Sequence, residues 1–328
     1  MSVIFSRAPL RISLGGGGTD LPSYYREHGG FFVSGAIDKY VYMLTHTVFQ
    51  RRYRMKYSEL EEVDEIGQIR HPILREGLLR HWRGNPLEIA SVADVPAGTG
   101  MGSSGAYTVC LLKGLVRARH TSIGPGDLAE AACEIEMDVL GEPVGKQDPY
   151  VAAHGGICAY TIHRKGRVDV EPVELDPQAL RRLRERLLLF YTGEARSASA
   201  MLADQDRRSR EGDAEMIENL HRTKDLGRQI HKLLSDGDLE AYAELMHEHW
   251  MHKRRRSPGM ASEHIDSLYA LARGSGAIGG KLVGAGGGGF LLVYTRRPED
   301  TRQAMAAAEA FELAFDFEFG GAHASEYA

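Results

Sequence analysis

Three kinds of feature are scarce in this sequence, and each scarcity excludes a class of protein. The 328 residues include only three cysteines, Cys110, Cys133 and Cys158, which lie far apart and form no C-x-x-C pair. We therefore expect buried thiols in a reducing compartment rather than disulfides or a thiolate metal site. Apolar runs stay short of the roughly 18 residues of a membrane span, and the N-terminus offers too little for a signal peptide. The sequence predicts a cytoplasmic protein with no membrane partner.

Basic residues are also fewer than acidic ones. The formal net charge is −5, from 40 Lys and Arg against 45 Asp and Glu, which argues against a broad nucleic-acid surface and favours a small polar ligand. With 43% hydrophobic and 26% charged residues, the composition is that of an ordinary globular protein with a sizeable core, most simply arranged as two domains.

Strands and helices alternate in the first half of the chain. β-branched and aromatic residues predict strands, whereas apolar residues at helical spacing predict helices. We expect Asp127 to cap the helix that follows it and Lys165-Gly166 to form a hairpin turn. The predicted strands are 3–16, 29–49, 86–96 and 155–175, and the predicted helices are 57–82, 103–119 and 128–141.

The second half begins with a strand at 186–193 and then changes character. Two long helices are predicted at 203–234 and 238–256, a third near 261–273, and a strand pair at 276–297. We place a domain boundary near residue 185, giving domains 1–185 and 186–328, with the site in the cleft between them.

A first glycine segment, residues 15–18, lies within LGGGGTDLPSYY. A flexible linker would carry serine with its glycines and little else, so we expect something to approach this backbone closely. The alternative is an ordinary turn, because glycine also supplies positive φ angles.

A second glycine segment, residues 96–105, is PAGTGMGSSG. Gly100-x-Gly102-x-x-Gly105 formally matches the dinucleotide-binding fingerprint, but the acidic residue expected about 20 positions later is missing, and no Walker A lysine follows. Small residues before a helix still leave backbone N–H groups free for phosphate oxygens. Ser103 and Ser104 add hydroxyls that could reach phosphate or Mg²⁺. A capped core helix without a ligand is the alternative.

Two further segments contain unusual combinations of residues. In GEPVGKQDPY, residues 141–150, glycine and proline fix an irregular backbone that presents Lys146 and Asp148. Asp148 could instead cap a helix with Pro149 at its first position. The third glycine segment, residues 284–289 of GAGGGGF, fits the dinucleotide pattern again but runs into a strand, which shows how weak that pattern is alone.

Taken in order, RAPLRISLGGGGTD, PAGTGMGSSGAYTV, GKQDPY and GAGGGGFLL resemble the signature motifs of the GHMP small-molecule kinases, the group of galactokinase, homoserine kinase and mevalonate kinase. Within that family, GGGGTDLPSYY and RHPILRE are most similar to bacterial D-glycero-D-manno-heptose 7-phosphate kinases, and fucose kinases share part of the pattern. The resemblance implies an α+β fold with a ribosomal-protein-S5-like N-terminal domain, a ferredoxin-like C-terminal domain and an active site in the cleft.

The resemblance also implies residue roles. Asp148 would accept or orient the proton of the attacking hydroxyl, and Arg11 would pair with it. ATP and Mg²⁺ would be required, with Ser104 and Glu136 as metal ligands, although Glu134 or Asp138 could replace Glu136. The ATP phosphates would meet Gly98, Gly100, Gly102, Ser103, Ser104 and Gly105, and the sugar would meet Gly16, Gly17, Gly18, Thr19, Asp20, Gly286 and Gly287.

The expected reaction is phosphorylation of the anomeric hydroxyl of D-glycero-D-manno-heptose 7-phosphate by a monomer or homodimer. Alternatives are a kinase for an unphosphorylated sugar, an NAD(P)-dependent oxidoreductase and a ligand-binding protein without activity. Some cation must meet a 7-phosphate. The basic run Lys253–Arg256 is either that cation or a solvated helix end, and Arg51, Arg52 and Lys56 are equally weak candidates. His247, His249 and His252 are an unfavourable metal set, because residues two apart on a helix point apart.

Overall fold

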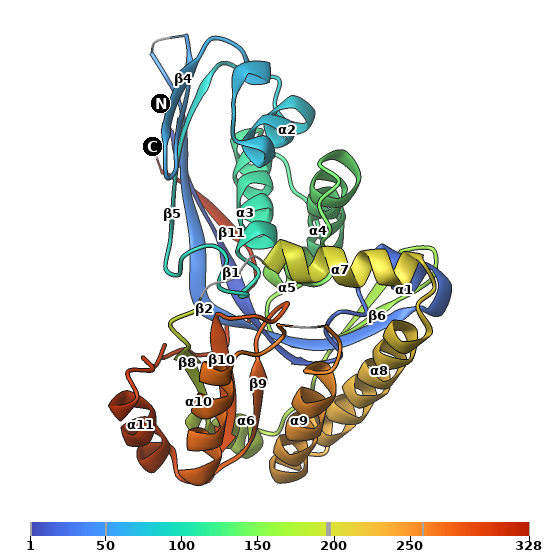
Figure 1. Ribbon diagram of the computed structural model, residues 1–328. Coiled ribbons are helices and arrows are strands. Elements are labelled where there is room, and N and C mark those ends of the chain that lie inside the picture. The colour runs from blue at the N-terminus through green and yellow to red at the C-terminus, as the bar shows by residue number, and fades with distance from the viewer. Residues whose placement is uncertain (1, 50, 195–197, 258, 328) are drawn as a thin grey trace.

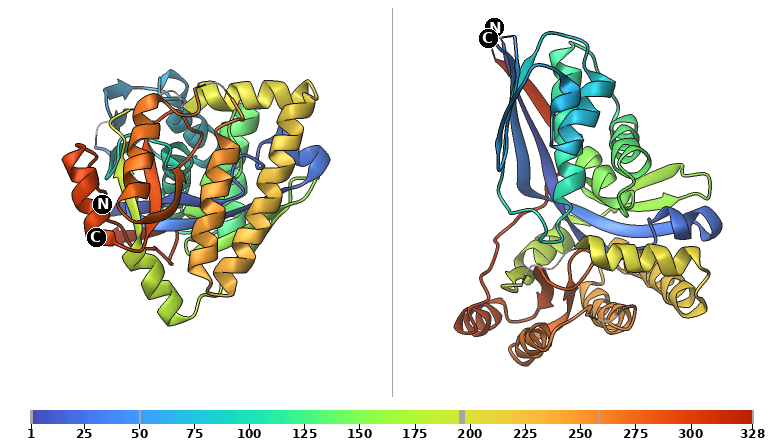
Figure 2. Two further views of the ribbon diagram at one scale, coloured as in Figure 1. Left: turned by 60° about the horizontal axis from the view of Figure 1, so that its bottom comes forward. Right: turned by 45° about the horizontal axis from the view of Figure 1, so that its top comes forward.

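The computed structural model describes residues 2–49, 51–194, 198–257 and 259–327 (Figure 1). Two β-sheets organise these residues, one of eight strands and one of three. The described helices and strands show a mixed α+β architecture, with the helices packed on and between the two sheets (Figures 1 and 2).

The larger sheet is built around two long strands, β1 (Val3–Gly15) and β2 (Gly30–Thr47), whose order with their neighbours is β11-β1-β2-β5-β3-β4. The 18 residues of β2 are long enough to pair with two partners in succession. Its first part pairs with β6 (Ile157–Ile162) and its last part with β5 (Leu87–Ala93). β6 continues into β7 (Val168–Pro172) through the expected hairpin, in which Gly166 has a φ of 88°.

Helix α3 (Ser103–Ala118) packs on β1 and β2 with an almost wholly buried apolar face. Around it lie α2 (Pro72–His81), α4 (Pro125–Cys133) and α5 (Gln147–His154) (Figure 1). The predicted helix 57–82 forms only in its second half. The first half instead contributes β4 (Leu60–Val63), which pairs with β3 (Tyr53–Lys56), and a 3₁₀ turn at Ile66–Gln68.

The smaller sheet has the order β8-β10-β9, formed by Leu187–Tyr191, Phe290–Thr295 and Ala277–Leu282. α9 (Leu239–Lys253) and α10 (Glu263–Gly274) pack on β9, and α11 (Pro298–Ala307) packs on α10. α8 (Ala214–Ser235) lies between α9 and the strands β1 and β2 of the larger sheet. α6 (Pro177–Arg186) precedes β8, and α7 (Ala198–Arg210) contacts α1 (Pro22–His28).

Two helix predictions were wrong, one in the middle of the predicted helix and one at its start. The stretch 203–234 is not one helix, because Gly212 adopts a φ of 69° and the Asp213 side chain caps a new helix by accepting from the Met216 N–H. Asp127 is not a cap either. Gly124 occupies the cap position and Pro125 begins the helix. Asp127 lies in the first turn, where a negative side chain interacts favourably with the helix dipole.

The final described strand, β11 (His323–Tyr327), returns to the larger sheet and pairs antiparallel with the start of β1, so that Val3 faces Tyr327 and the two ends of the chain lie side by side (Figure 2). The division into 1–185 and 186–328 stays a prediction, but residues 323–327 belong to the sheet of the first half. Cys110, Cys133 and Cys158 are buried free thiols, as expected. Among the described residues, no helix is both long and apolar enough to span a bilayer.

Candidate active site

One pocket lies where the two halves of the chain meet. It is bounded by the end of β1, the first glycine segment, the start of α5, the end of α9 and the end of β9. Its charged lining residues are Arg11, Asp20, Asp148, Lys253, Arg256 and Lys281.

Arg11 and Asp148 form a two-pronged ion pair in this pocket. The Arg11 Nε donates to Asp148 Oδ1 at 2.8 Å and the Arg11 Nη2 lies 2.6 Å from the same oxygen. The Arg11 Nη1 also donates to the carbonyl of Gly100 at 2.5 Å, which ties the pair to the second glycine segment. The Arg11 side chain is 6% exposed and that of Asp148 is 30% exposed, so the carboxylate remains reachable from the pocket. Asp148 lies in the first turn of α5, whose cap position is Lys146, so it is not the helix cap.

The second glycine segment passes close to this pair. Gly98, Gly100 and Gly102 have φ angles of 81°, 81° and 77°, a region that side chains disfavour. A Cβ on Gly102 would lie 3.0 Å from Asp148 and 3.2 Å from Arg11, and one on Gly105 would lie 2.7 Å from the Asp148 Cβ. Glycine at these positions therefore lets the start of α3 approach the ion pair. The Ser103 Oγ, also at the start of α3, is buried and has no partner among the described residues.

Ser104 and Glu136 are brought together as expected. The Ser104 Oγ donates to Glu136 Oε2 at 2.5 Å, while the other carboxylate oxygen, Oε1, is buried and has no partner among the described residues. Burial raises the pKa of Glu136 to about 7, although the Ser104 hydrogen bond opposes the shift. The alternatives Glu134 and Asp138 are exposed. Glu136 lies four and three residues after the buried Ala132 and Cys133, so it continues the buried face of α4 into the π-helical turn at Glu134–Val139.

The first glycine segment and Asp20 form another side of the pocket. One oxygen of Asp20 accepts the Gly18 N–H at 3.1 Å and the other accepts the Gln147 N–H at 3.0 Å. Burial raises the pKa of Asp20, partly offset by these backbone hydrogen bonds. Gly17, Gly18 and Asp20 line the pocket.

Four expected sugar contacts lie elsewhere. Gly16 is buried and does not line the pocket, and its N–H donates to the Nε2 of His249. Thr19 is fully buried behind the first glycine segment, and its Oγ1 bonds to the carbonyls of Gly16 and Phe31, so it braces the turn instead of facing the pocket. Gly286 and Gly287 pack against Met260, whose carbonyl accepts the Gly287 N–H, and the pocket is lined instead by their neighbours Gly284 and Ala285.

The pocket is also lined by what we call the basic wall, namely His249, Lys253, Arg256 and Lys281, of which only Lys281 was absent from the candidates taken from the sequence. All four line the pocket and are at most 4% exposed. The solvated helix end expected at Lys253–Arg256 is therefore wrong for Lys253 and Arg256, whereas Arg255 is exposed. Lys281 was overlooked, although a lysine within an apolar strand directly before a glycine segment was the available signal.

The remaining candidates do not contribute to the pocket. His247 bonds to Tyr269 and His252 to the Asn219 carbonyl, so the three histidines do not converge. Within the described ranges no group of three or more His, Cys, Asp or Glu side chains could hold a metal ion. Arg52 pairs with Asp64 and Lys56 with Glu88 at the β3 edge, and the neighbouring Arg51 is exposed there.

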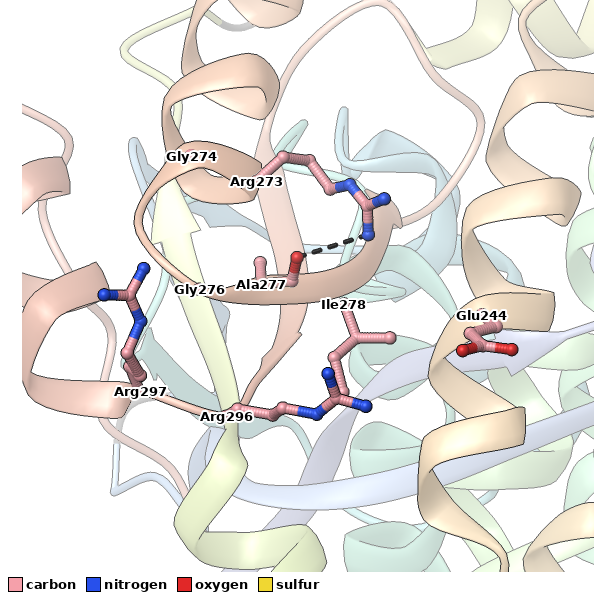
Figure 3. Close-up of a pocket in the computed structure, with 8 residues that line it drawn as sticks. All are labelled: Glu244, Arg273, Gly274, Gly276, Ala277, Ile278, Arg296 and Arg297. Carbon is pink, nitrogen blue, oxygen red and sulfur yellow. Dashed lines mark hydrogen bonds between the residues drawn. The ribbon is translucent and has the colours of Figure 1, made fainter.

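A second hollow of about 750 Å³ lies beside the start of β9, at the opposite end of that strand from Lys281 (Figure 3). Its arginines already have partners. Arg273 donates to the Ala277 carbonyl, Arg296 pairs with Glu240, and Arg297 pairs with Asp300. Glu244, Gly274 and Gly276 also line this hollow. The ion pairs of Arg296 and Arg297, however, are made with residues outside it, whereas Arg11 and Asp148 pair within the pocket.

The family of the chain follows from profile matches on both halves. Residues 73–156 match the GHMP kinases N terminal domain and residues 216–312 match the GHMP kinases C terminal domain, together more than half of the chain. The chain belongs to the GHMP kinases. It is therefore a phosphotransferase with an alcohol group as acceptor, and the pocket lies between segments of the two matched domains.

Individual relatives of this GHMP kinase are distant in sequence, but each matches most of this chain. D-glycero-alpha-D-manno-heptose 7-phosphate kinase of Campylobacter jejuni is 27% identical over 307 residues, covering 90% of each chain. The bifunctional fucokinase/GDP-fucose pyrophosphorylase of Arabidopsis thaliana is 25% identical, and this chain spans 30% of its length. A crystal structure of a D-glycero-D-manno-heptose 1-phosphate kinase from Bacteroides thetaiotaomicron shares the fold, with a TM-score of 0.82, 24% identity and 99% coverage of both chains.

Proposed function

We propose that this GHMP kinase transfers the γ-phosphoryl group of ATP to the anomeric hydroxyl of D-glycero-D-manno-heptose 7-phosphate, giving the 1,7-bisphosphate used to make a nucleotide-activated heptose. The observation that carries the proposal is the Arg11–Asp148 pair, which lies against the second glycine segment on one side and opens to the pocket on the other. The name of the Campylobacter jejuni relative supports the choice of acceptor.

In this proposal Asp148 receives the proton of the acceptor hydroxyl. The hydroxyl oxygen forms its bond to the γ-phosphorus as the bond to the ADP oxygen breaks. Arg11 holds the carboxylate in place through its two nitrogens and lies where negative charge develops on the transferred group. Phosphoryl transfer needs little covalent chemistry from the protein, so the positioning of these groups supplies most of the catalysis.

The second glycine segment has the features expected of an ATP phosphate site. Its glycines leave backbone N–H groups uncovered before α3, and the Ser103 hydroxyl there is buried without a partner among the described residues. Ser104 and Glu136 suit a divalent cation, because an unpartnered carboxylate oxygen and a hydroxyl are oxygen ligands of the kind Mg²⁺ prefers. Mg²⁺ held there would offset charge on the phosphates.

The acceptor sugar would lie between Asp148 and Asp20. Asp20 is fixed by two backbone N–H groups, so its carboxylate is already oriented when a sugar hydroxyl arrives. The backbone of Gly17 and Gly18 allows the sugar ring to approach closely.

The test is ADP release from Mg·ATP with D-glycero-D-manno-heptose 7-phosphate, run beside mannose, fucose and galactose. Strong preference for the phosphorylated heptose is expected. Turnover only with an unphosphorylated sugar would keep the kinase and its catalytic pair but reject the heptose assignment. No ADP with any sugar would favour a protein that binds a ligand without reacting with it, and an NAD(P)-dependent shift in melting temperature would favour an oxidoreductase.

A further inference from the structure

The ammonium group of Lys281 is buried without a counter-ion. Its side chain is 1% exposed, and its one hydrogen bond is to the Ser13 Oγ at 3.4 Å. An ammonium carries three donors, and a buried one without an anion pays a large desolvation cost. The pKa of Lys281 is accordingly lowered to about 7, by burial and then by the nearby Arg256 and Arg11. In the described ranges no carboxylate lies within ion-pair distance of its Nζ.

The other two cations of the basic wall are bonded to neutral acceptors. The Lys253 Nζ donates to the carbonyls of Leu282 and Gly284. Arg256 donates to Asn219 Oδ1, Gln205 Oε1 and Thr223 Oγ1. Asp20 is the acidic group that attracts Arg256 through its charge, and Asp148 is already paired with Arg11. The wall therefore holds more positive charge than its described surroundings balance.

His249 adds a donor to the same wall. The Gly16 N–H donates to its Nε2 at 3.3 Å, so Nε2 acts as an acceptor. Burial and the neighbouring cations lower the pKa of His249 well below its usual value, which keeps the ring neutral. The single ring proton must then be on Nδ1, and this buried nitrogen has no partner among the described residues. A fourth group of the wall thus offers an N–H to an acceptor.

These groups face the acceptor side of the pocket. Lys281 contacts Ser13 at the end of β1, and an Arg256 nitrogen lies 3.5 Å from the carbonyl of Gly17 in the first glycine segment. Arg11, by contrast, is bonded to Gly100 of the second glycine segment. Arg256 therefore meets the first glycine segment and Lys281 the end of β1 just before it, whereas Arg11 meets the second glycine segment.

We infer that the basic wall is a subsite for a phosphate monoester carried by the acceptor, separate from the region that takes the ATP phosphates. The inference rests on the proposed function and deepens it, because it says which residues would hold the phosphate that the acceptor already carries. A phosphate dianion supplies the charge that Lys281, Lys253 and Arg256 lack, and its oxygens accept the free N–H groups of Lys281 and His249.

The test compares D-mannose 6-phosphate with D-mannose, which differ only in the phosphate, together with D-glycero-D-manno-heptose 7-phosphate. In Lys281→Met, kcat/KM for the phosphorylated acceptors should fall about 10- to 100-fold more than kcat/KM for mannose, the loss expected for a hydrogen bond between charged groups. Lys232→Met, which removes an exposed lysine paired with Asp236, is the matched control and should leave this ratio unchanged.

Equal loss of kcat/KM for both kinds of acceptor would overturn the inference, because Lys281 would then serve the transferred phosphoryl group or ATP. Folding is checked by thermal unfolding, where Lys281→Met should melt at or above the wild-type temperature because an unpaired buried charge is gone. Lys281→Gln is the second variant if the methionine variant does not fold.

Calorimetric titration of D-mannose 6-phosphate without nucleotide separates this inference from the proposed reaction. Binding that is tighter than that of mannose and is weakened in Lys281→Met supports the subsite even if no sugar is phosphorylated, in which case the proposed function falls alone. Turnover of the heptose 7-phosphate with unchanged kinetics in Lys281→Met would keep the function and reject the subsite.

Discussion

The two sides of the pocket are charged oppositely and are completed in different ways. The acidic side, Asp20 and Asp148, comes from the first half of the chain, and each carboxylate already has its partners, backbone N–H groups for Asp20 and Arg11 for Asp148. The basic wall comes from the second half, and its cations are bonded to neutral groups or nearly unbonded. The acidic side is thus organised before any ligand arrives, whereas the basic wall is left with charge that only a ligand can balance.

The largest expected effect is on the acidic side. Asp148→Asn keeps the shape of the side chain but cannot take the proton of the acceptor hydroxyl, so kcat should fall at least about 10²-fold while the protein still folds. Steady-state ADP release and circular dichroism measure the two quantities. Basic-wall variants should mainly raise KM for the phosphorylated acceptor. Near-normal turnover of Asp148→Asn would remove this residue from the mechanism. It would also remove the distinction between an acidic side that sets kcat and a basic wall that sets KM.

Glu136 provides a test of whether a group outside the basic wall also carries charge that its surroundings do not balance. Its folded-state pKa of about 7 lies above the ordinary 4.5, so its contribution to stability is complete below about pH 4.5 and is lost as the pH rises through 7. Between pH 5 and pH 8 the free energy of unfolding should fall in the wild type as Glu136 titrates. In Glu136→Gln this fall should be smaller by on the order of 2 kcal/mol. Urea unfolding at both pH values measures this. Identical pH dependence in the two proteins would mean that Glu136 is not the titrating group.

Asp20→Asn tests how much the two backbone hydrogen bonds of Asp20 contribute to organising the acidic side before a ligand binds. The amide nitrogen cannot accept a hydrogen bond, so either the Gly18 or the Gln147 N–H loses its acceptor, at a cost of about 1–3 kcal/mol. We expect a lower melting temperature and a roughly 10-fold higher KM for the acceptor, with a smaller change in kcat. An unaltered KM would place the sugar elsewhere in the pocket.

The smallest effect is expected at Arg254, which adjoins Lys253 in the sequence but pairs with Asp266 outside the pocket. Arg254→Gln should change stability by less than about 1 kcal/mol, the usual value of a partly exposed ion pair, and leave the kinetic constants within about twofold. If Arg254→Gln instead lowered kcat/KM for phosphorylated acceptors more than for mannose, as expected for Lys281→Met, the basic wall would include the whole run Lys253–Arg256.

The acidic side and the glycine segments were predictable because their residues sit in contiguous motifs. The second glycine segment stood out in the local sequence, whereas the roles of Asp148 and Arg11 came from the resemblance of their motifs to those of the GHMP kinases. Glu136 could have been preferred over Glu134 and Asp138, because it lies three and four residues after the buried Cys133 and Ala132 and so continues the buried face of α4. The sequence prediction left the choice open because it did not compare these spacings.

The basic wall was harder to predict because it assembles residues from two elements. His249 and Lys253 lie four residues apart on the inward face of α9, with the buried Met246 and Trp250, and Arg256 follows three residues later, beyond the end of the helix. That spacing was visible in the sequence. The run Lys253–Arg256 was nevertheless interpreted as a solvated helix end, because its four residues were treated as a group and not assigned to the inward and outward faces of the helix. Thr19 shows the converse error, because a polar residue beside a glycine segment can bond to its own backbone and never meet the ligand.

The pairing of β11 with β1 has a consequence for biosynthesis. β1, which carries Arg11, leaves the ribosome well before the strand that covers its outer edge, because that strand begins only at His323. Until then the start of β1 has an unpaired edge, and exposed strand edges recruit other strands. Newly made chains should thus be most prone to wrong pairing during the synthesis of the roughly 300 residues between the two strands, a period in which a chaperone would matter most.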